Sequence, residues 1–139
     1  MLIRENKNTP SWMKKVLFLA GIYNIFWGAI TIFFPIQTLA FLGIGDLNYP
    51  QIWQCLGMIV GVYGLGYFIA ARNPVAHWPI IFVGFLGKLL GPVGFLWSAF
   101  TGSLPWRFGL LNVTNDLVWL FPFALILLYS RKRAADFLY

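Results

Sequence analysis

Two charged side chains of opposite sign lie inside long apolar stretches of this sequence. Lys88 lies in the segment GFLGKLLGP, and Asp116 lies in NDLVWLFPF. A lysine at the centre of a membrane helix costs about 2.5–3.5 kcal/mol on insertion scales, and an acidic partner reduces that cost. We therefore predict a Lys88–Asp116 pair within an intramembrane polar cluster. Three asparagines are its expected hydrogen-bond partners: Asn24, Asn112 and Asn115.

Two interpretations of this pair stay open at the level of sequence. In the first, the pair only fixes the register of the helices. In the second, it lines a cavity for a polar head group or another small ligand, because ionisable residues inside a membrane are candidates for function. Passage of protons or ions would need a chain of titratable groups, and only one acid and one lysine lie deep in the apolar stretches.

The composition indicates that the lipid bilayer surrounds most of the chain. Of 139 residues, 60% are hydrophobic and 10% are charged, whereas soluble domains average roughly 25% charged residues. The net charge of +6 does not indicate nucleic-acid binding here, because basic residues that flank apolar spans act as topology signals. We expect the bilayer, and not nucleic acid, as a partner.

The sequence offers no set of metal ligands and no cofactor motif. It contains one cysteine, Cys55, and one histidine, His77. Two ligands of this kind, far apart in the chain, do not form a zinc site, and no nucleotide-binding or nucleophile motif is present. We therefore expect no metal, no cofactor and no assigned catalytic residue, and the sequence favours a protein that is not an enzyme.

Four apolar stretches are each long enough to cross a bilayer, which takes about 20 residues of helix. They cover residues 16–34, 52–71, 79–100 and 108–129. Because backbone polar groups in lipid must be satisfied within the segment, each stretch is predicted to be a helix. The expected fold is an all-α integral membrane four-helix bundle, as a single transmembrane domain over residues 1–139. The connection over residues 35–50 is partly apolar and is predicted to hold a short interfacial helix before a turn at Gly45–Asp46.

Basic residues are concentrated on one side of this arrangement. With four spans, one side carries Arg4, Lys7, Lys14, Lys15, Arg72, Arg131, Lys132 and Arg133, and the other carries Arg107. The positive-inside rule then places both termini of a multi-pass membrane protein in the cytoplasm. Arg72, His77 and Trp78 are expected at the membrane interface. Trp27 and Trp119 lie deeper than interfacial tryptophans usually do.

Small residues recur at steps of three and four, which places them on one face of each helix. In the second span they are Gly57, Gly61 and Gly64, and in the third they are Gly84, Gly87 and Gly91. Such stripes are typical of close helix packing. The alternative, that the glycines leave room for a ligand, stays open.

Three segments resemble blocks of an uncharacterised family of small four-helix bacterial inner-membrane proteins. They are WQCLGMIVGVYGLGYFIAARNP, HWPIIFVGFLGKLLGPVGF and NDLVWLFPF. In size and plan the chain also resembles the DoxX-like proteins, four-helix inner-membrane proteins of which some are linked to membrane oxidoreductase complexes. This second resemblance implies an accessory role in a respiratory or photosynthetic membrane assembly, and it transfers no functional residue.

The expected function is that of a binding or interaction module in the membrane. The chain would be either an accessory subunit of a larger membrane protein complex or a binder of a lipophilic small molecule, and it could also form homo-oligomers. The alternatives are a membrane enzyme that acts on a lipid or quinone, with Lys88 and Asp116 as acid–base groups, and a small transporter.

Overall fold

The computed structural model describes residues 9–45 and 48–135, and over these residues it is helical with no strand. Four helices are long and apolar enough to cross a membrane. The elements in chain order are α1 (Ser11–Phe33), α2 (Pro35–Phe41), α3 (Pro50–Arg72), α4 (Trp78–Phe100), the 3-10 turn η1 (Trp106–Phe108), α5 (Gly109–Asn112), the π-helical turn η2 (Val113–Leu117) and α6 (Val118–Ala135).

These helices confirm the all-α fold, and the length and composition of four of them are compatible with the four predicted spans. Each predicted span falls within one of the four candidate spans to within one residue. α1 begins earlier than its predicted span, so Lys14 and Lys15 lie in its first turns, where long basic side chains can extend to the membrane surface. The predicted helix after the first span is present as α2. Arg4, Lys7 and Asp46 lie outside the described residues.

Prolines mark the starts of three helices. Pro35, Pro50 and Pro79 occupy the first or second position of α2, α3 and α4, where the missing N–H would have no helical acceptor. Two further prolines, Pro92 and Pro122, lie inside α4 and α6. A proline inside a helix leaves the carbonyl four residues earlier without its N–H partner.

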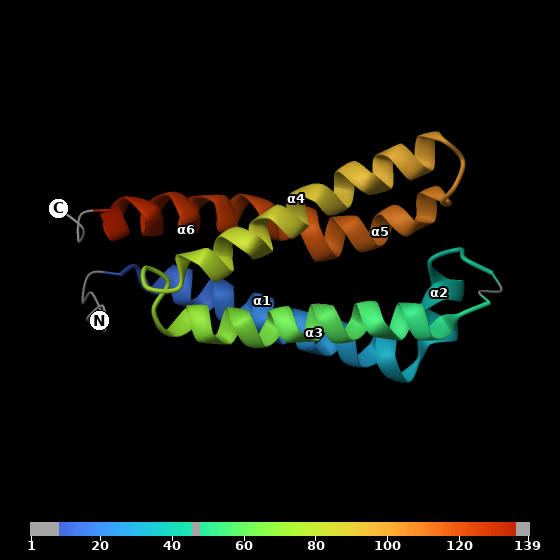
Figure 1. Cartoon of the computed structure of the whole chain (residues 1–139), viewed down its shortest axis with the longest axis horizontal. Helices are drawn as coiled ribbons and strands as arrows, with labels where there is room; N and C mark the ends of the chain where they lie inside the picture. Colours follow the sequence, from blue (N-terminus) through green and yellow to red (C-terminus); the bar gives the residue numbers. More distant parts are fainter. Residues whose placement is uncertain (1–8, 46–47, 136–139) are drawn as a thin grey trace.

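The first hairpin pairs α1 with α3 at a distance that only glycine permits. A Cβ on Gly28 would stand 2.6 Å from the carbonyl oxygen of Gly57, and a Cβ on Gly64 would stand 2.9 Å from that of Gly21. Real Cβ atoms do not approach so closely, so these glycines bring the two backbones together as in other small-residue membrane interfaces. Figure 1 shows α1 and α3 side by side along their length.

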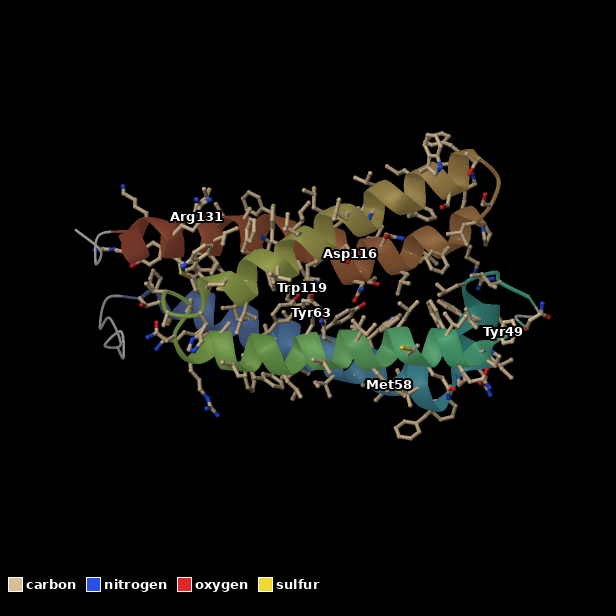
Figure 2. The ribbon with its side chains drawn as sticks, viewed as in Figure 1. Tyr49, Met58, Tyr63, Asp116, Trp119 and Arg131 are labelled. Carbon is tan, nitrogen blue, oxygen red and sulfur yellow. The ribbon has the colours of Figure 1, made fainter. Side chains whose placement is uncertain are left out.

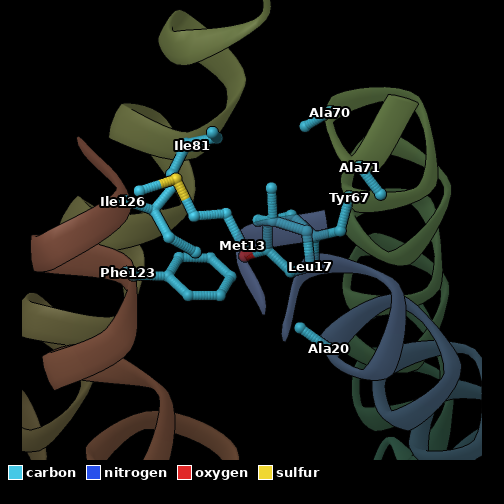
Figure 3. Close-up of a cluster of buried hydrophobic side chains, with 9 residues drawn as sticks. All are labelled: Met13, Leu17, Ala20, Tyr67, Ala70, Ala71, Ile81, Phe123 and Ile126. Carbon is cyan, nitrogen blue, oxygen red and sulfur yellow. The ribbon is translucent and has the colours of Figure 1, made fainter. Parts of the chain in front are cut away.

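The second hairpin consists of α4 and the α5–α6 segment, and it meets the first hairpin mainly near the end that carries the described parts of both termini (Figure 1). There, side chains from α1, α3, α4 and α6 form one buried cluster, drawn in Figure 3. Its members are Met13, Leu17, Ala20, Tyr67, Ala70, Ala71, Ile81, Phe123 and Ile126. A smaller cluster of Leu39, Leu42 and Trp53 holds α2 against α3 at the opposite end. The residues of the predicted polar cluster, Lys88 and Asp116 among them, lie between these two hydrophobic clusters along the length of the molecule.

Candidate functional site

A widened turn in the last span shapes the candidate site. In η2 the backbone follows a π-helix, which accommodates about one extra residue and redirects carbonyl groups away from the regular helical ladder. Two carbonyls of this turn accept side-chain hydrogen bonds. Trp119 Nε1 donates to the Thr114 oxygen over 3.1 Å, and Lys88 Nζ donates to the Asn115 oxygen over 2.6 Å.

Lys88 reaches this carbonyl from α4 through the interior of the molecule. Its side chain is 4% exposed. The Nζ atom lies 5.8 Å from the ring centroid of Tyr67 and 5.7 Å from that of Phe123, which are distances at which an aromatic ring attracts a cation. The two rings contact each other edge to face at 5.0 Å. The ammonium is therefore held by one backbone oxygen and two aromatic rings.

The three glycines around Lys88 on α4 have two different roles. A Cβ on Gly84 would stand 2.5 Å from the Tyr67 hydroxyl, and a Cβ on Gly91 would stand 2.8 Å from Asp116 Oδ2. These two glycines therefore allow Tyr67 and Asp116 to lie against the α4 backbone. Gly87 has no such neighbour within 4 Å of its Cβ position, so it borders open space. One turn after the lysine, Pro92 leaves the Lys88 carbonyl without its helical N–H donor.

Lys88 borders a cavity of about 190 Å³ between the two hairpins. Polar side chains from four helices line it, namely Asn24, Tyr63, Tyr67, Lys88, Asn115 and Asp116. Asn24 uses its Nδ2 to donate to the Val60 carbonyl over 3.2 Å. Its Oδ1 and the Oδ1 of Asn115 are both buried without a hydrogen-bond partner. Since buried polar atoms normally have partners, these two oxygens are unused acceptors on residues that line the cavity.

The predicted polar cluster is largely brought together, but its central contact differs from the prediction. Lys88, Asp116, Asn24 and Asn115 line one cavity, and Figure 2 shows Asp116 near mid-length of the molecule, on the second hairpin. Lys88 and Asp116, both described, interact electrostatically without a direct ion-pair contact, and the hydrogen bond of the lysine goes to the Asn115 carbonyl. Asn112 is buried beside this site, with Oδ1 3.6 Å from the Cβ position of Gly91, but it does not line the cavity.

Like the glycines of α4, those of α3 are of two kinds: some pack against a neighbouring helix and one faces open space. Gly57 and Gly64 lie against α1, where a Cβ on Gly57 would stand 2.9 Å from the Cβ of Thr31. Gly61 has no atom within 4 Å of its own Cβ position, so its Cα–H points into open space. The stripe of small residues therefore combines packing positions with an open one.

A larger apolar groove lies next to the polar cavity. It has a volume of about 560 Å³ and is lined mainly by Trp27, Ile30, Phe34, Phe41, Leu42, Trp53, Leu110 and Leu111. It also contacts Thr114, the residue before Asn115. Trp53 is fixed at its edge, because its Nε1 donates to Thr38 Oγ1 over 2.8 Å and its ring packs against Trp27. The deep position of Trp27 is thus explained by the groove.

The residues predicted at the interface lie at the end with the described parts of the termini. Arg72 is exposed and lines a cleft with Lys14 and Lys15. His77 Nδ1 lies 2.9 Å from the Asn73 carbonyl oxygen in the turn between α3 and α4. Trp78 packs beneath Arg131, whose guanidinium carbon is 5.7 Å from the ring centroid.

Sequence analysis missed two aromatic residues of the site, Tyr67 and Phe123. Each looks like ordinary membrane-helix composition, and only the three-dimensional packing places them around the Lys88 ammonium. Trp119, noted in the sequence for its depth, packs on η2 through its bond to the Thr114 carbonyl. Within the described ranges, no group of three His, Cys, Asp or Glu side chains could hold a metal ion. No protein-family model, curated protein or solved structure matches the chain. Of the resemblances noted above, the first rests on the quoted segments alone and the second on size and plan alone.

Proposed function

We propose that this chain is an integral membrane protein, with both termini in the cytoplasm of a bacterial inner membrane, that binds a lipophilic small molecule with an uncharged polar head. The observation that carries the proposal is the mid-length cavity with two unpartnered amide oxygens, Asn24 Oδ1 and Asn115 Oδ1. The membrane location is supported by four apolar helices. The orientation is supported by the basic residues at the end with the described termini.

The chemistry of the lining indicates the kind of head group. The Lys88 ammonium has three N–H groups and uses one on the Asn115 carbonyl, so it can donate to a ligand. The two amide oxygens and the Asp116 carboxylate can accept. A hydroxyl-bearing or quinol-like head satisfies both requirements because it donates and accepts, and the opposite charges of Lys88 and Asp116 leave the lining without a net charge that would favour an ionic head.

The neighbouring groove provides space for the apolar part of such a molecule. Its lining is mostly aliphatic and aromatic, with Gln37, Thr38 and Thr114 as its polar members, and Thr114 is followed in the chain by Asn115, which lines the cavity. A ligand placed across this border would have its polar head at the lysine and its apolar part among Trp27, Leu110 and Leu111.

The test compares two leucine substitutions on α4 that differ only in position. Gly87→Leu narrows the cavity, whereas Gly94→Leu lies two turns further along, outside the lining, and its Cβ position is also open. Each variant is extracted from native membrane in mild detergent, and co-purified small molecules are identified by mass spectrometry. We expect a neutral lipophile in near-stoichiometric amount with the unmodified chain and with Gly94→Leu, and its loss with Gly87→Leu.

Two results would contradict the proposal. The first is the absence of any retained lipophile from the unmodified chain, which would leave water as the occupant of the cavity. The second is equal retention by both leucine variants, which would place the ligand elsewhere. Circular dichroism of each variant verifies that the helices are intact.

A further inference from the structure

A second cleft lies at the end of the α1–α3 hairpin near the start of α1. It has a volume of about 540 Å³ and shares no lining residue with the polar cavity or the apolar groove. Its lining comes from both helices of the hairpin and consists of Lys14, Lys15, Phe18, Phe68, Ala71 and Arg72. Three of these six residues are basic and none is acidic.

The cleft is layered along the helix axes. Lys14 and Lys15 lie close to the start of α1, and Arg72 is the last residue of α3. Phe18 and Phe68 lie about one turn deeper on the same two helices, with ring centroids 5.2 Å apart. Phe18 is 52% exposed. The opening of the cleft is therefore basic, formed by Lys14, Lys15 and Arg72, and its floor is aromatic, formed by Phe18 and Phe68.

A glycine on α1 shapes this floor. A Cβ on Gly21 would stand 2.6 Å from Cε1 of Phe68, so the Phe68 ring can cover the α1 backbone only because residue 21 has no side chain. The floor is therefore a built feature of the hairpin interface and not a chance meeting of two exposed rings.

We propose that this cleft binds an anionic phospholipid, with the phosphate between Lys15 and Arg72 and an acyl chain against Phe18 and Phe68. The layering matches a lipid that presents a negative head group above its hydrocarbon. Basic residues near a membrane surface attract anionic lipids, and a net-neutral phosphatidylcholine, which carries its own cation, gains less from them. The inference depends on the membrane location of the chain and not on a ligand in the polar cavity.

The experiment measures lipid binding to the full chain in detergent by native mass spectrometry. The probes are dioleoylphosphatidylglycerol, dioleoylphosphatidylcholine and sn-glycerol 3-phosphate. We expect phosphatidylglycerol to bind most tightly. The double variant Lys15→Gln/Arg72→Gln should weaken that binding roughly 25-fold, at roughly five-fold for each cation lost. The variant Lys15→Arg/Arg72→Lys keeps both positive charges, so it should retain most of the affinity of the unmodified chain.

The matched control removes two charges from the same end of the molecule. Lys132 and Arg133 are exposed on α6 and do not line the cleft, so Lys132→Gln/Arg133→Gln should change the affinity less than three-fold. Equal losses in the two double variants would overturn the proposal, because they would show general surface attraction. Binding of glycerol phosphate as tight as that of phosphatidylglycerol would also overturn it. Lys15→Gln alone, at an exposed position of α1, gives a five-fold test that leaves α3 unchanged.

Discussion

Replacing Gly28 by alanine tests the close approach of α1 and α3 at its tightest point. The new Cβ would stand 2.6 Å from the Gly57 carbonyl oxygen, and 3.2 Å from the backbone nitrogen of Gly61. Both neighbours are backbone atoms, so neither can move aside by a change of rotamer. The helices would have to separate.

The expected size of the effect follows from two opposing contributions. Overpacking a close interface costs about 1–3 kcal/mol, and alanine in place of glycine within a helix returns up to about 1 kcal/mol. We therefore expect Gly28→Ala to lower the free energy of unfolding by about 1–2 kcal/mol. Gly61→Ala on the facing helix meets no atom within 4 Å, so it should be neutral or stabilise the chain by about 0.4–1 kcal/mol.

The assay is unfolding of the full chain by sodium dodecyl sulfate in mixed micelles, followed by far-ultraviolet circular dichroism. The informative quantity is the difference between the two alanine variants, about 2 kcal/mol on the estimates above. If Gly28→Ala is as stable as the unmodified chain, or if both variants lose the same stability, the described helix approach is wrong.

Three further predictions use the polar contacts and the topology. Lys88→Met should cost about 1–3 kcal/mol in the same unfolding assay because the buried Asn115 carbonyl loses its donor, whereas Asn115→Ala keeps that carbonyl and should cost less; equal costs would refute the contact. Trp53→Phe should cost about 1 kcal/mol because it removes the hydrogen bond to Thr38 Oγ1. In a Thr38→Val background, which already lacks this bond, the same substitution should cause little further loss of stability. A cysteine at position 134 should react with impermeant maleimide only from the cytoplasm, and reaction only from the outside would reverse the proposed orientation.

The spans were predictable because hydrophobic length is a property of composition within a window. Four apolar segments separated by prolines and polar turns allow little choice of fold. The inward position of Lys88 was also predictable, because a charge in an apolar helix is more stable facing a bundle interior than facing lipid. The stripe that contains Gly84, Gly87 and Gly91 then indicated which face turns inward.

The details of the site were not predictable because they depend on how neighbouring helices are rotated and spaced. Gly57 and Gly61 belong to one GxxxG pattern, yet only Gly57 has atoms near its Cβ position. The partner of Lys88 is a backbone carbonyl made available by η2, and VTNDL contains neither proline nor glycine to signal such a turn. Side-chain charges alone therefore favoured Asp116 as the partner.

The widened turn η2 also sets how the two halves of the last span are rotated relative to each other about the helix axis. A π-turn is equivalent to inserting about one residue into an α-helix, and one residue corresponds to a rotation of roughly 100° about the helix axis. Leu110 and Leu111, which line the apolar groove, precede the turn, whereas Phe123, which faces Lys88, follows it. A related chain one residue shorter between positions 113 and 117 could continue as a regular α-helix with both flanks still aligned, but it would lose the widened turn that frees the Asn115 carbonyl for Lys88. A single-residue deletion at this turn would thus mark a chain that keeps the four helices without the lysine contact.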